Sequence, residues 1–88
     1  MDVLFAPIFV RTLRSFPEGL QEEVIEKIEL FRDPSKHKAL KVHKLTGRLK
    51  DRYAFSVNYK IRIIFSYLSI KPRSAILLAV GDHNVYDR

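Results

Sequence analysis

The sequence predicts an α+β fold in which two N-terminal helices pack on one face of a mostly antiparallel, twisted sheet, in the order β-α-α-β-β-β. Three observations predict it. Apolar residues recur at helical spacing over residues 18–32, apolar and polar residues alternate from residue 53 onward, and residues 75–80 are apolar without interruption. At 88 residues the chain can bury one modest core, so we expect a single domain over residues 1–88.

The N-terminal part predicts one strand and a helical hairpin. Residues 2–6 form a short apolar run, and the Pro7 that follows suits the first turn of a helix because its missing N–H would have no partner there. We expect a strand over residues 2–6, a helix over residues 7–15 and an interruption at Phe16-Pro17. The second helix, over residues 18–32, carries an apolar stripe formed by Leu20, Val24, Ile28 and Phe31.

Charge is distributed unevenly along the chain. Residues 17–33 hold six acidic and two basic side chains, so the net charge of +6 for the whole chain leaves +10 for the rest. Residues 36–52 hold seven Lys or Arg and one Asp, and should form an exposed basic connection with a short helical or extended piece around residues 40–45. A basic surface with one acidic flank is typical of a protein that binds a polyanion, although it can also serve solubility alone.

The C-terminal part predicts three further strands. Two segments alternate apolar and polar residues, which is typical of half-buried antiparallel strands, and a third is wholly apolar, which favours a buried central strand. The expected elements are strands over residues 53–57, 60–67 and 75–80, turns at Asn58-Tyr59 and at residues 71–73, and a polar tail after Gly81.

The alternation also predicts a functional face of the sheet. The side away from the helices should carry Ala54, Ser56, Lys60 and Arg62. No further segment of the chain is left to form a second covering layer. We therefore expect this face to be a wet, concave and basic surface.

Several classes of protein are excluded or disfavoured. The sequence contains no cysteine, which excludes disulfides, thiolate zinc sites and a cysteine nucleophile. The three histidines, at positions 37, 43 and 83, do not have the spacing of paired metal ligands, so we expect neither a metal nor a cofactor. The N-terminal apolar run is short and soon reaches Arg11, which predicts no signal peptide or membrane span and places the protein in the cytoplasm.

Several runs of residues, in this order, resemble the RelE/ParE toxin superfamily of type II toxin–antitoxin systems. They are residues 43–50 (HKLTGRLK), 53–57 (YAFSV), 59–65 (YKIRIIF) and 80–86 (VGDHNVY), and with the two helices they span nearly the whole chain. The HKLTG and GDH elements are most similar to YafQ-like members. The resemblance implies two helices on a twisted antiparallel sheet, a cognate antitoxin in a hetero-oligomer and, often, growth arrest through ribosome-dependent mRNA cleavage.

That activity, of an endoribonuclease called an mRNA interferase, needs no metal. The ribose 2′-hydroxyl attacks the adjacent phosphate, so the protein must remove one proton, stabilise the phosphoryl oxygens and protonate the leaving 5′-oxygen. The resemblance makes His83, just after the strand-ending Gly81, the first candidate for proton transfer, because imidazole titrates near pH ~6.5. A solvent-facing histidine without a role is the alternative.

Other site residues also follow from the resemblance. Arg62 matches an arginine that would hold the scissile phosphate, although a structural pair with Asp82 or Asp87 is the alternative. Tyr86 matches a near-terminal tyrosine that would stack on a base or aid proton transfer, or it only packs at an edge. His43 matches the histidine before Leu-Thr-Gly in YafQ-like toxins. Contacts to mRNA or rRNA phosphates are expected from Lys44, Arg48, Lys50, Arg52 and Lys60.

The sequence departs from the family pattern in one strand. RelE has lysines where Ala54 and Ser56 stand, and the YafQ-like histidine of that strand is replaced by Ser56 or Val57. His37 has no counterpart in the family. Three functions therefore stay open: an mRNA interferase, a ParE-like inhibitor of DNA gyrase, which needs no proton-transfer residue, and a catalytically degenerate homologue that only binds an antitoxin.

The expected protein partner is an antitoxin whose acidic segment covers the basic surface. An uncompensated positive surface favours an acidic partner, and the residues around Lys44, Lys50 and Arg62 carry that charge. A helix or an extended strand of the antitoxin would cover this basic surface and the apolar helical hairpin. The mRNA and the ribosome are the other expected partners, and no contact with a membrane is expected.

Overall fold

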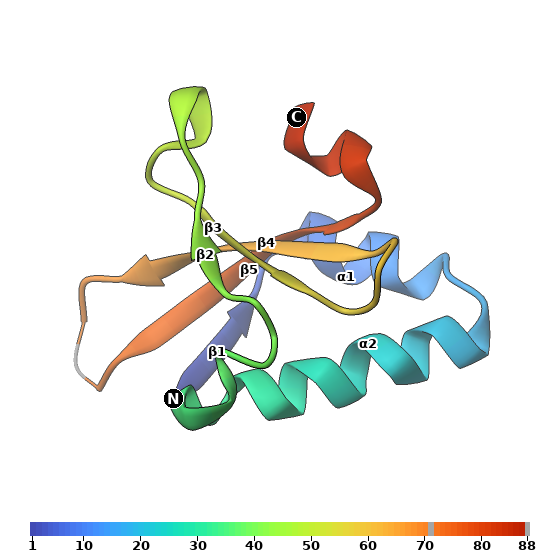
Figure 1. Cartoon of the computed structure of the whole chain (residues 1–88). Helices are drawn as coiled ribbons and strands as arrows, with labels where there is room; N and C mark the ends of the chain where they lie inside the picture. The colour runs from blue at the N-terminus through green and yellow to red at the C-terminus, as the bar shows by residue number, and fades with distance from the viewer. Residues whose placement is uncertain (71, 88) are drawn as a thin grey trace.

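The computed structural model describes residues 1–70 and 72–87 and consists of helices packed on one five-stranded sheet (Figure 1). The sheet has the strand order β1-β5-β4-β3-β2. Its strands are β1 (Asp2–Phe5), β2 (His43–Lys44), β3 (Tyr53–Ser56), β4 (Arg62–Leu68) and β5 (Ser74–Gly81). The helices are α1 (Pro7–Arg14) and α2 (Glu18–Phe31), with short 3-10 helices η1 (Pro34–Lys36), η2 (Gly47–Leu49) and η3 (His83–Asp87).

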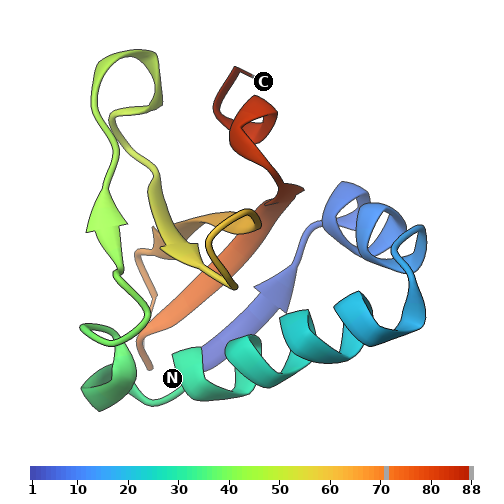
Figure 2. The ribbon, with the colours of Figure 1, turned by 45° about the vertical axis from the view of Figure 1, so that its right-hand side comes forward.

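The predicted α+β layout is confirmed. β1 pairs with β5 in parallel and all other neighbours are antiparallel. Both views show α2 beneath the sheet and the segments of η2 and η3 above it (Figures 1 and 2). Within the described part of the chain, no helix is long and apolar enough to span a membrane.

The two predicted helices and four predicted strands form within one or two residues of the expected bounds. The short piece expected around residues 40–45 contains a further strand, which the predicted order did not count. A fifth strand, β2, pairs His43 with Ala54 and Lys44 with Tyr53. Both of its residues are exposed and show no apolar alternation. This strand forms through its pairing with β3, so no local pattern indicated it. The turn expected at residues 71–73 includes Lys71, which lies outside the described residues.

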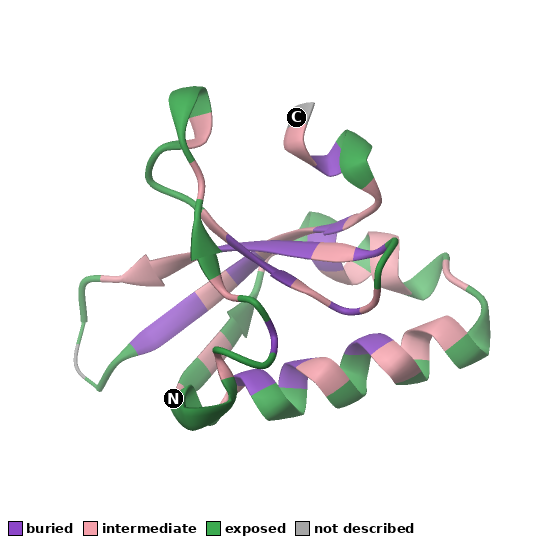
Figure 3. Cartoon of the chain, viewed as in Figure 1, coloured by how far each residue is buried: buried purple, intermediate pink, exposed green. Residues whose placement is uncertain are grey.

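Aromatic side chains dominate the core between α2 and the sheet. Phe31, the last residue of α2, is fully buried and stacks on Phe55 of β3 with ring centroids 4.5 Å apart. It also meets the edge of Phe65 of β4 at 4.7 Å. Figure 3 shows the buried residues along the sheet-facing side of α2 and along the central strands. The stripe predicted for this helix therefore does face the core.

A register shift in β5 corrects the expectation of a strand buried throughout. Ile64 of β4 pairs with Ala79 and Phe65 pairs with Leu77, so Leu78 is an extra residue on β5. The bulge resets the alternation, and both Leu77 and Val80 consequently point into the core. Ile76, Leu78 and Ala79 of the same strand are half-buried.

The face of the sheet opposite α2 is not the open basic surface that the alternation predicted. Ala54 is fully buried and Ile64 is 3% exposed, although both lie on this face. The C-terminal tail folds back as η3 and buries Val85, which packs near β4 and β5. A short 3-10 helix at the end of the chain therefore covers part of a face that we expected to be wet.

Candidate functional site

A groove on the covered face brings together two parts of the chain that are far apart in the sequence. Its volume is about 400 Å³, and it lies between the β2–η2 segment and η3. We call it the histidine groove. It is lined by His43, Leu45, Thr46, Arg48, Leu49 and Tyr86. Three of the predicted site residues, His43, Arg48 and Tyr86, thus meet at one place.

The ring of His43 is oriented by a backbone hydrogen bond. Its Nδ1 lies 2.8 Å from the carbonyl oxygen of Lys41. Because a carbonyl oxygen only accepts, Nδ1 must carry the proton and donate it. In the neutral ring Nε2 is then the unprotonated nitrogen, which can accept a proton. The side chain is exposed, so this nitrogen can be reached from solvent.

The carbonyl that holds His43 belongs to a residue in a strained conformation. Lys41 has φ 60, in the left-handed region that residues with a Cβ rarely adopt. It is the one such non-glycine residue in ranges 1–70 and 72–87. Strain of this kind persists where the surrounding structure requires it.

Replacing Lys41 with glycine should raise the free energy of unfolding by about 0.5–1 kcal/mol, because glycine has no Cβ to strain at this φ. Urea unfolding of both proteins would measure the change. Lys38→Gly is the matched control, since Lys38 is an exposed lysine of the same turn whose φ is not positive. That variant should lose about 0.5–1 kcal/mol. A loss in Lys41→Gly as large as in Lys38→Gly would show that position 41 is not strained.

His83 and Tyr86 lie together on η3. Their ring centroids are 6.2 Å apart with the planes inclined at 60°. η3 begins with a turn in which the Asp82 carboxylate accepts the N–H of Asn84 and the Asp82 carbonyl accepts the N–H of Val85. His83 is exposed and Tyr86 is half-buried. The structure therefore places His83 beside the histidine groove, next to a residue that lines it.

Arg62 does not line this groove, although it pairs with Gly81, two residues before His83. It is half-buried at the start of β4, and its Nη1 donates to the carbonyl of Asn58 at 2.8 Å. Asn58 also accepts the N–H groups of Lys60 and Ile61 on its side-chain oxygen and donates to Glu23 of α2 at 2.6 Å. Among the side chains that the structure describes, no ion pair joins Arg62 to Asp82. The side chain of Asp87, its other expected rival partner, lies outside the description.

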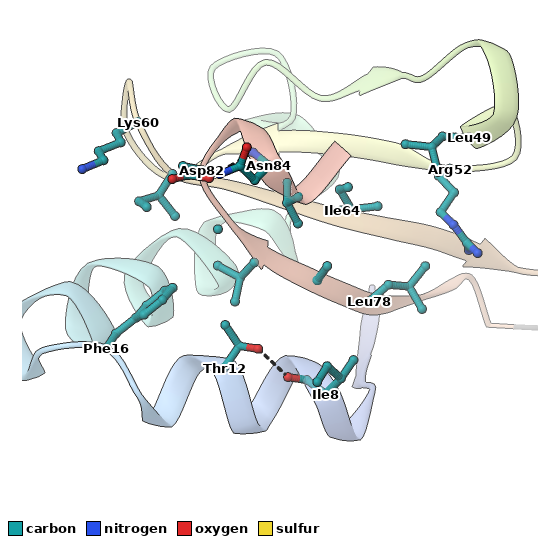
Figure 4. Close-up of a pocket in the computed structure, with 15 residues that line it drawn as sticks. Ile8, Thr12, Phe16, Leu49, Arg52, Lys60, Ile64, Leu78, Asp82 and Asn84 are labelled. Atoms are coloured by element: carbon teal, nitrogen blue, oxygen red, sulfur yellow. Dashed lines mark hydrogen bonds between the residues drawn. The ribbon is translucent and has the colours of Figure 1, made fainter. Parts of the chain in front are cut away.

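A second and larger groove lies between α1 and the sheet. Its volume is about 620 Å³, and we call it the apolar groove. Figure 4 shows α1 as one wall and β4 and β5 as the other. Apolar side chains include Ile8, Phe16, Leu49, Ile64, Leu78 and Val85. The predicted phosphate-binding residues Arg52 and Lys60 line it too, at opposite ends in the view of Figure 4.

The predicted basic residues are therefore divided among several surfaces. Arg48 lines the histidine groove, whereas Arg52 and Lys60 line the apolar groove. Lys44 on β2 and Lys50 after η2 are exposed and line neither groove. Arg52 also donates to the hydroxyl of Ser66 at 3.4 Å, which ties its segment to β4.

Some residues of the site received no role from the sequence. Thr46 belongs to the HKLTG run and lines the histidine groove. A hydroxyl residue two positions from a basic residue on each side could have been recognised in the sequence as a possible phosphate contact. Leu45 and Leu49 line it as apolar walls, which nothing local in the sequence indicated. Over the described residues, no three His, Asp or Glu side chains gather closely enough to hold a metal ion.

Comparison with solved structures identifies the fold. No protein-family model matches the chain, and no curated protein sequence matches it. The RelE–RelB complex from Pyrococcus horikoshii OT3 superposes with a TM-score of 0.70 at 21% identity, over 92% of this chain and 92% of that chain. The toxin–antitoxin complex RelBE2 from Mycobacterium tuberculosis also gives 0.70, at 16% identity, over 93% and 96%.

A YafQ mutant from E. coli gives the same TM-score of 0.70 at 11% identity, over 97% of this chain and 96% of that chain. The two-helix, mixed-sheet fold of this chain is therefore the fold of the RelE/ParE-like toxins, as the sequence resemblance predicted.

Proposed function

We propose that this chain is the toxin of a toxin–antitoxin pair and that it acts in the cytoplasm as an endoribonuclease on mRNA held by the ribosome. The observation that carries the proposal is the meeting of His43, Arg48 and Tyr86 in one groove, with His83 beside it. These residues come from two ends of the basic C-terminal half of the chain. The shared fold with RelE and YafQ adds support.

In the proposed reaction His43 is the general base. Its Nδ1–H is held by the Lys41 carbonyl, so Nε2 is available to take the proton of a ribose 2′-hydroxyl. As that proton leaves, the 2′-oxygen forms a bond to the adjacent phosphorus. A base oriented by a third group in this way follows the general logic of activated nucleophiles.

The other groups complete the transfer. His83 donates a proton to the 5′-oxygen as its bond to phosphorus breaks, which leaves a 2′,3′-cyclic phosphate and a 5′-hydroxyl. Arg48 lies where its positive charge would stabilise the phosphoryl oxygens, and Tyr86 offers an aromatic face to a base. The exposed Lys44 and Lys50 would contact mRNA or rRNA phosphates without base specificity. Arg62 donates a hydrogen bond to Asn58 and does not line this groove, so we assign it no part in the proton transfers.

The apolar groove supports the proposal of an antitoxin partner. Most of its lining is apolar, and its charged lining residues are the basic Arg52 and Lys60 and the acidic Asp82. This net positive lining suits an amphipathic segment with acidic flanks. Ile8 on its rim is 51% exposed and would be covered by such a segment. RelE and RelBE2 were solved as toxin–antitoxin complexes.

Expression of the chain without its antitoxin should stop growth through loss of translation, because the proposed target is mRNA on the ribosome. Pulse labelling of protein, RNA and DNA in separate cultures would show protein synthesis falling first. The His43→Ala, His83→Ala double variant is the control and should leave protein synthesis intact. If DNA synthesis stops first while translation continues, the chain acts on gyrase and the endoribonuclease proposal fails.

A further inference from the structure

His37 lies outside both grooves, but it joins the end of α2 to the turn that leads to His43. Its Nε2 lies 2.8 Å from the carbonyl oxygen of Phe31, so Nε2 is the protonated nitrogen and donates. Its ring also stacks on Phe31, with centroids 4.8 Å apart and planes inclined by 13°. A hydrogen bond and a stacking contact to a fully buried residue together hold the ring in one orientation.

The turn that starts at His37 is closed by backbone hydrogen bonds. The N–H of Val42 donates to the His37 carbonyl at 3.0 Å, and the N–H of Lys41 donates to the Lys38 carbonyl at 3.1 Å. These bonds bring the chain back on itself with Lys41 in the left-handed conformation. His37 and Lys41 therefore belong to one hydrogen-bonded turn.

The middle of the turn is anchored to the core. Leu40 is 4% exposed and belongs to the buried cluster, and its carbonyl accepts the N–H of Ser56 at 3.0 Å. This leaves the Lys41 carbonyl beside the Nδ1 of His43. The pairing of His43 with Ala54 fixes the backbone of His43, but a backbone pair does not select a rotamer or a tautomer.

We propose that His37 is a positioning residue for His43. By fixing the turn from α2, it places the Lys41 carbonyl so that the His43 ring is held as the Nδ1–H tautomer, with Nε2 directed to the groove side as proton acceptor. The consequence for RNA cleavage rests on the proposed function. The consequence for the tautomer of His43 does not.

Two variants separate the contacts of His37. His37→Phe keeps an aromatic ring to stack on Phe31 but has no donor for the Phe31 carbonyl. His37→Gln keeps an N–H donor at about the same distance from the backbone as Nε2 but has no ring. Thermal melts of both would show that the fold persists. If His37→Phe does not fold, His37→Asn replaces it, because its amide is too short to reach the Phe31 carbonyl.

The ¹⁵N NMR spectrum of the His43 ring is the decisive measurement, and it needs no RNA. The parent protein should show the Nδ1–H form of neutral His43, whereas an imidazole free in water favours the Nε2–H form. The variant without the donor should shift His43 toward the Nε2–H form, and His37→Gln should restore the parental spectrum. A parental His43 tautomer in the folded variant without the donor would overturn the proposal.

Cleavage of translated mRNA gives the second readout. The variant without the donor should lower kcat by about 10-fold or more, because a displaced base is poorly aligned, and KM should change little since no RNA contact is removed. His37→Gln should recover most of kcat. If the NMR shift occurs but not even the parent cleaves RNA, the positioning role stands and the proposed function fails. If the parent cleaves and the variant without the donor matches its kcat, the positioning role fails.

Discussion

His43→Ala should slow cleavage of translated mRNA by roughly 100- to 10,000-fold, the usual range for loss of general acid–base catalysis. The physical reason is that, in the proposed reaction, the Nε2 of His43 accepts the proton of the 2′-hydroxyl, while its Nδ1–H is held by the Lys41 carbonyl. Primer extension on mRNA from cells, and a single-turnover assay on programmed ribosomes, would measure the loss.

The control for this variant is the neighbouring residue Lys44. Lys44→Ala removes an exposed charge next to His43 and should weaken binding of the ribosome with little change in the rate of the bound complex. His83→Ala should slow cleavage by a similar factor to His43→Ala, because the proposed reaction also needs a proton donor for the leaving 5′-oxygen. Both histidines are exposed, so thermal melts should stay close to the parent. A His43→Ala protein that melts normally and cuts at the parental rate would exclude His43 as the base.

Phe31→Ala should lower the free energy of unfolding by about 3–5 kcal/mol, the usual cost of removing a buried phenylalanine. Phe31 is fully buried and contacts the rings of Phe55, Phe65 and His37, so its removal leaves a cavity that rigid neighbours cannot fill. The free energy of unfolding of a native protein is only about 5–15 kcal/mol, so this change should leave the protein marginally stable. Urea unfolding followed by circular dichroism would measure it.

Leu30→Ala is the matched control for this prediction. Leu30 is the preceding residue of α2, but it is 37% exposed and outside the buried cluster. Its replacement should cost less than about 1 kcal/mol, since little apolar surface is removed from the core. Equal losses in the two variants would mean that the aromatic cluster is not what stabilises the packing of α2 on the sheet.

Local sequence patterns were sufficient for the regular elements. The stripe of Val24, Ile28 and Phe31 predicted α2 and its buried face, because helical periodicity is a property of neighbouring residues alone. Pro7 and Pro17 marked the starts of the two helices for a similarly local reason. The alternation from residue 53 onward likewise predicted β3 and β4. The candidate residues His43, His83 and Tyr86 were named from the resemblance of their segments to a family.

Tertiary structure decided what those elements do together. β2 exists only because β3 offers it a partner, and the bulge at Leu78 exists only because β4 and β5 share a register. The burial of Val85, in an otherwise polar tail, against β4 and β5 depends on an apolar surface that other segments create.

For the site, the sequence by itself determined which residue types were available, whereas the tertiary structure decided which of them meet. His43 and Tyr86 are more than forty positions apart and share one groove. Arg62, which the sequence placed with them, is held instead by the carbonyl of Asn58. The physical reason is that hydrogen bonds and burial act through space and are set by the packing of distant segments, which periodicity and spacing along the chain do not encode.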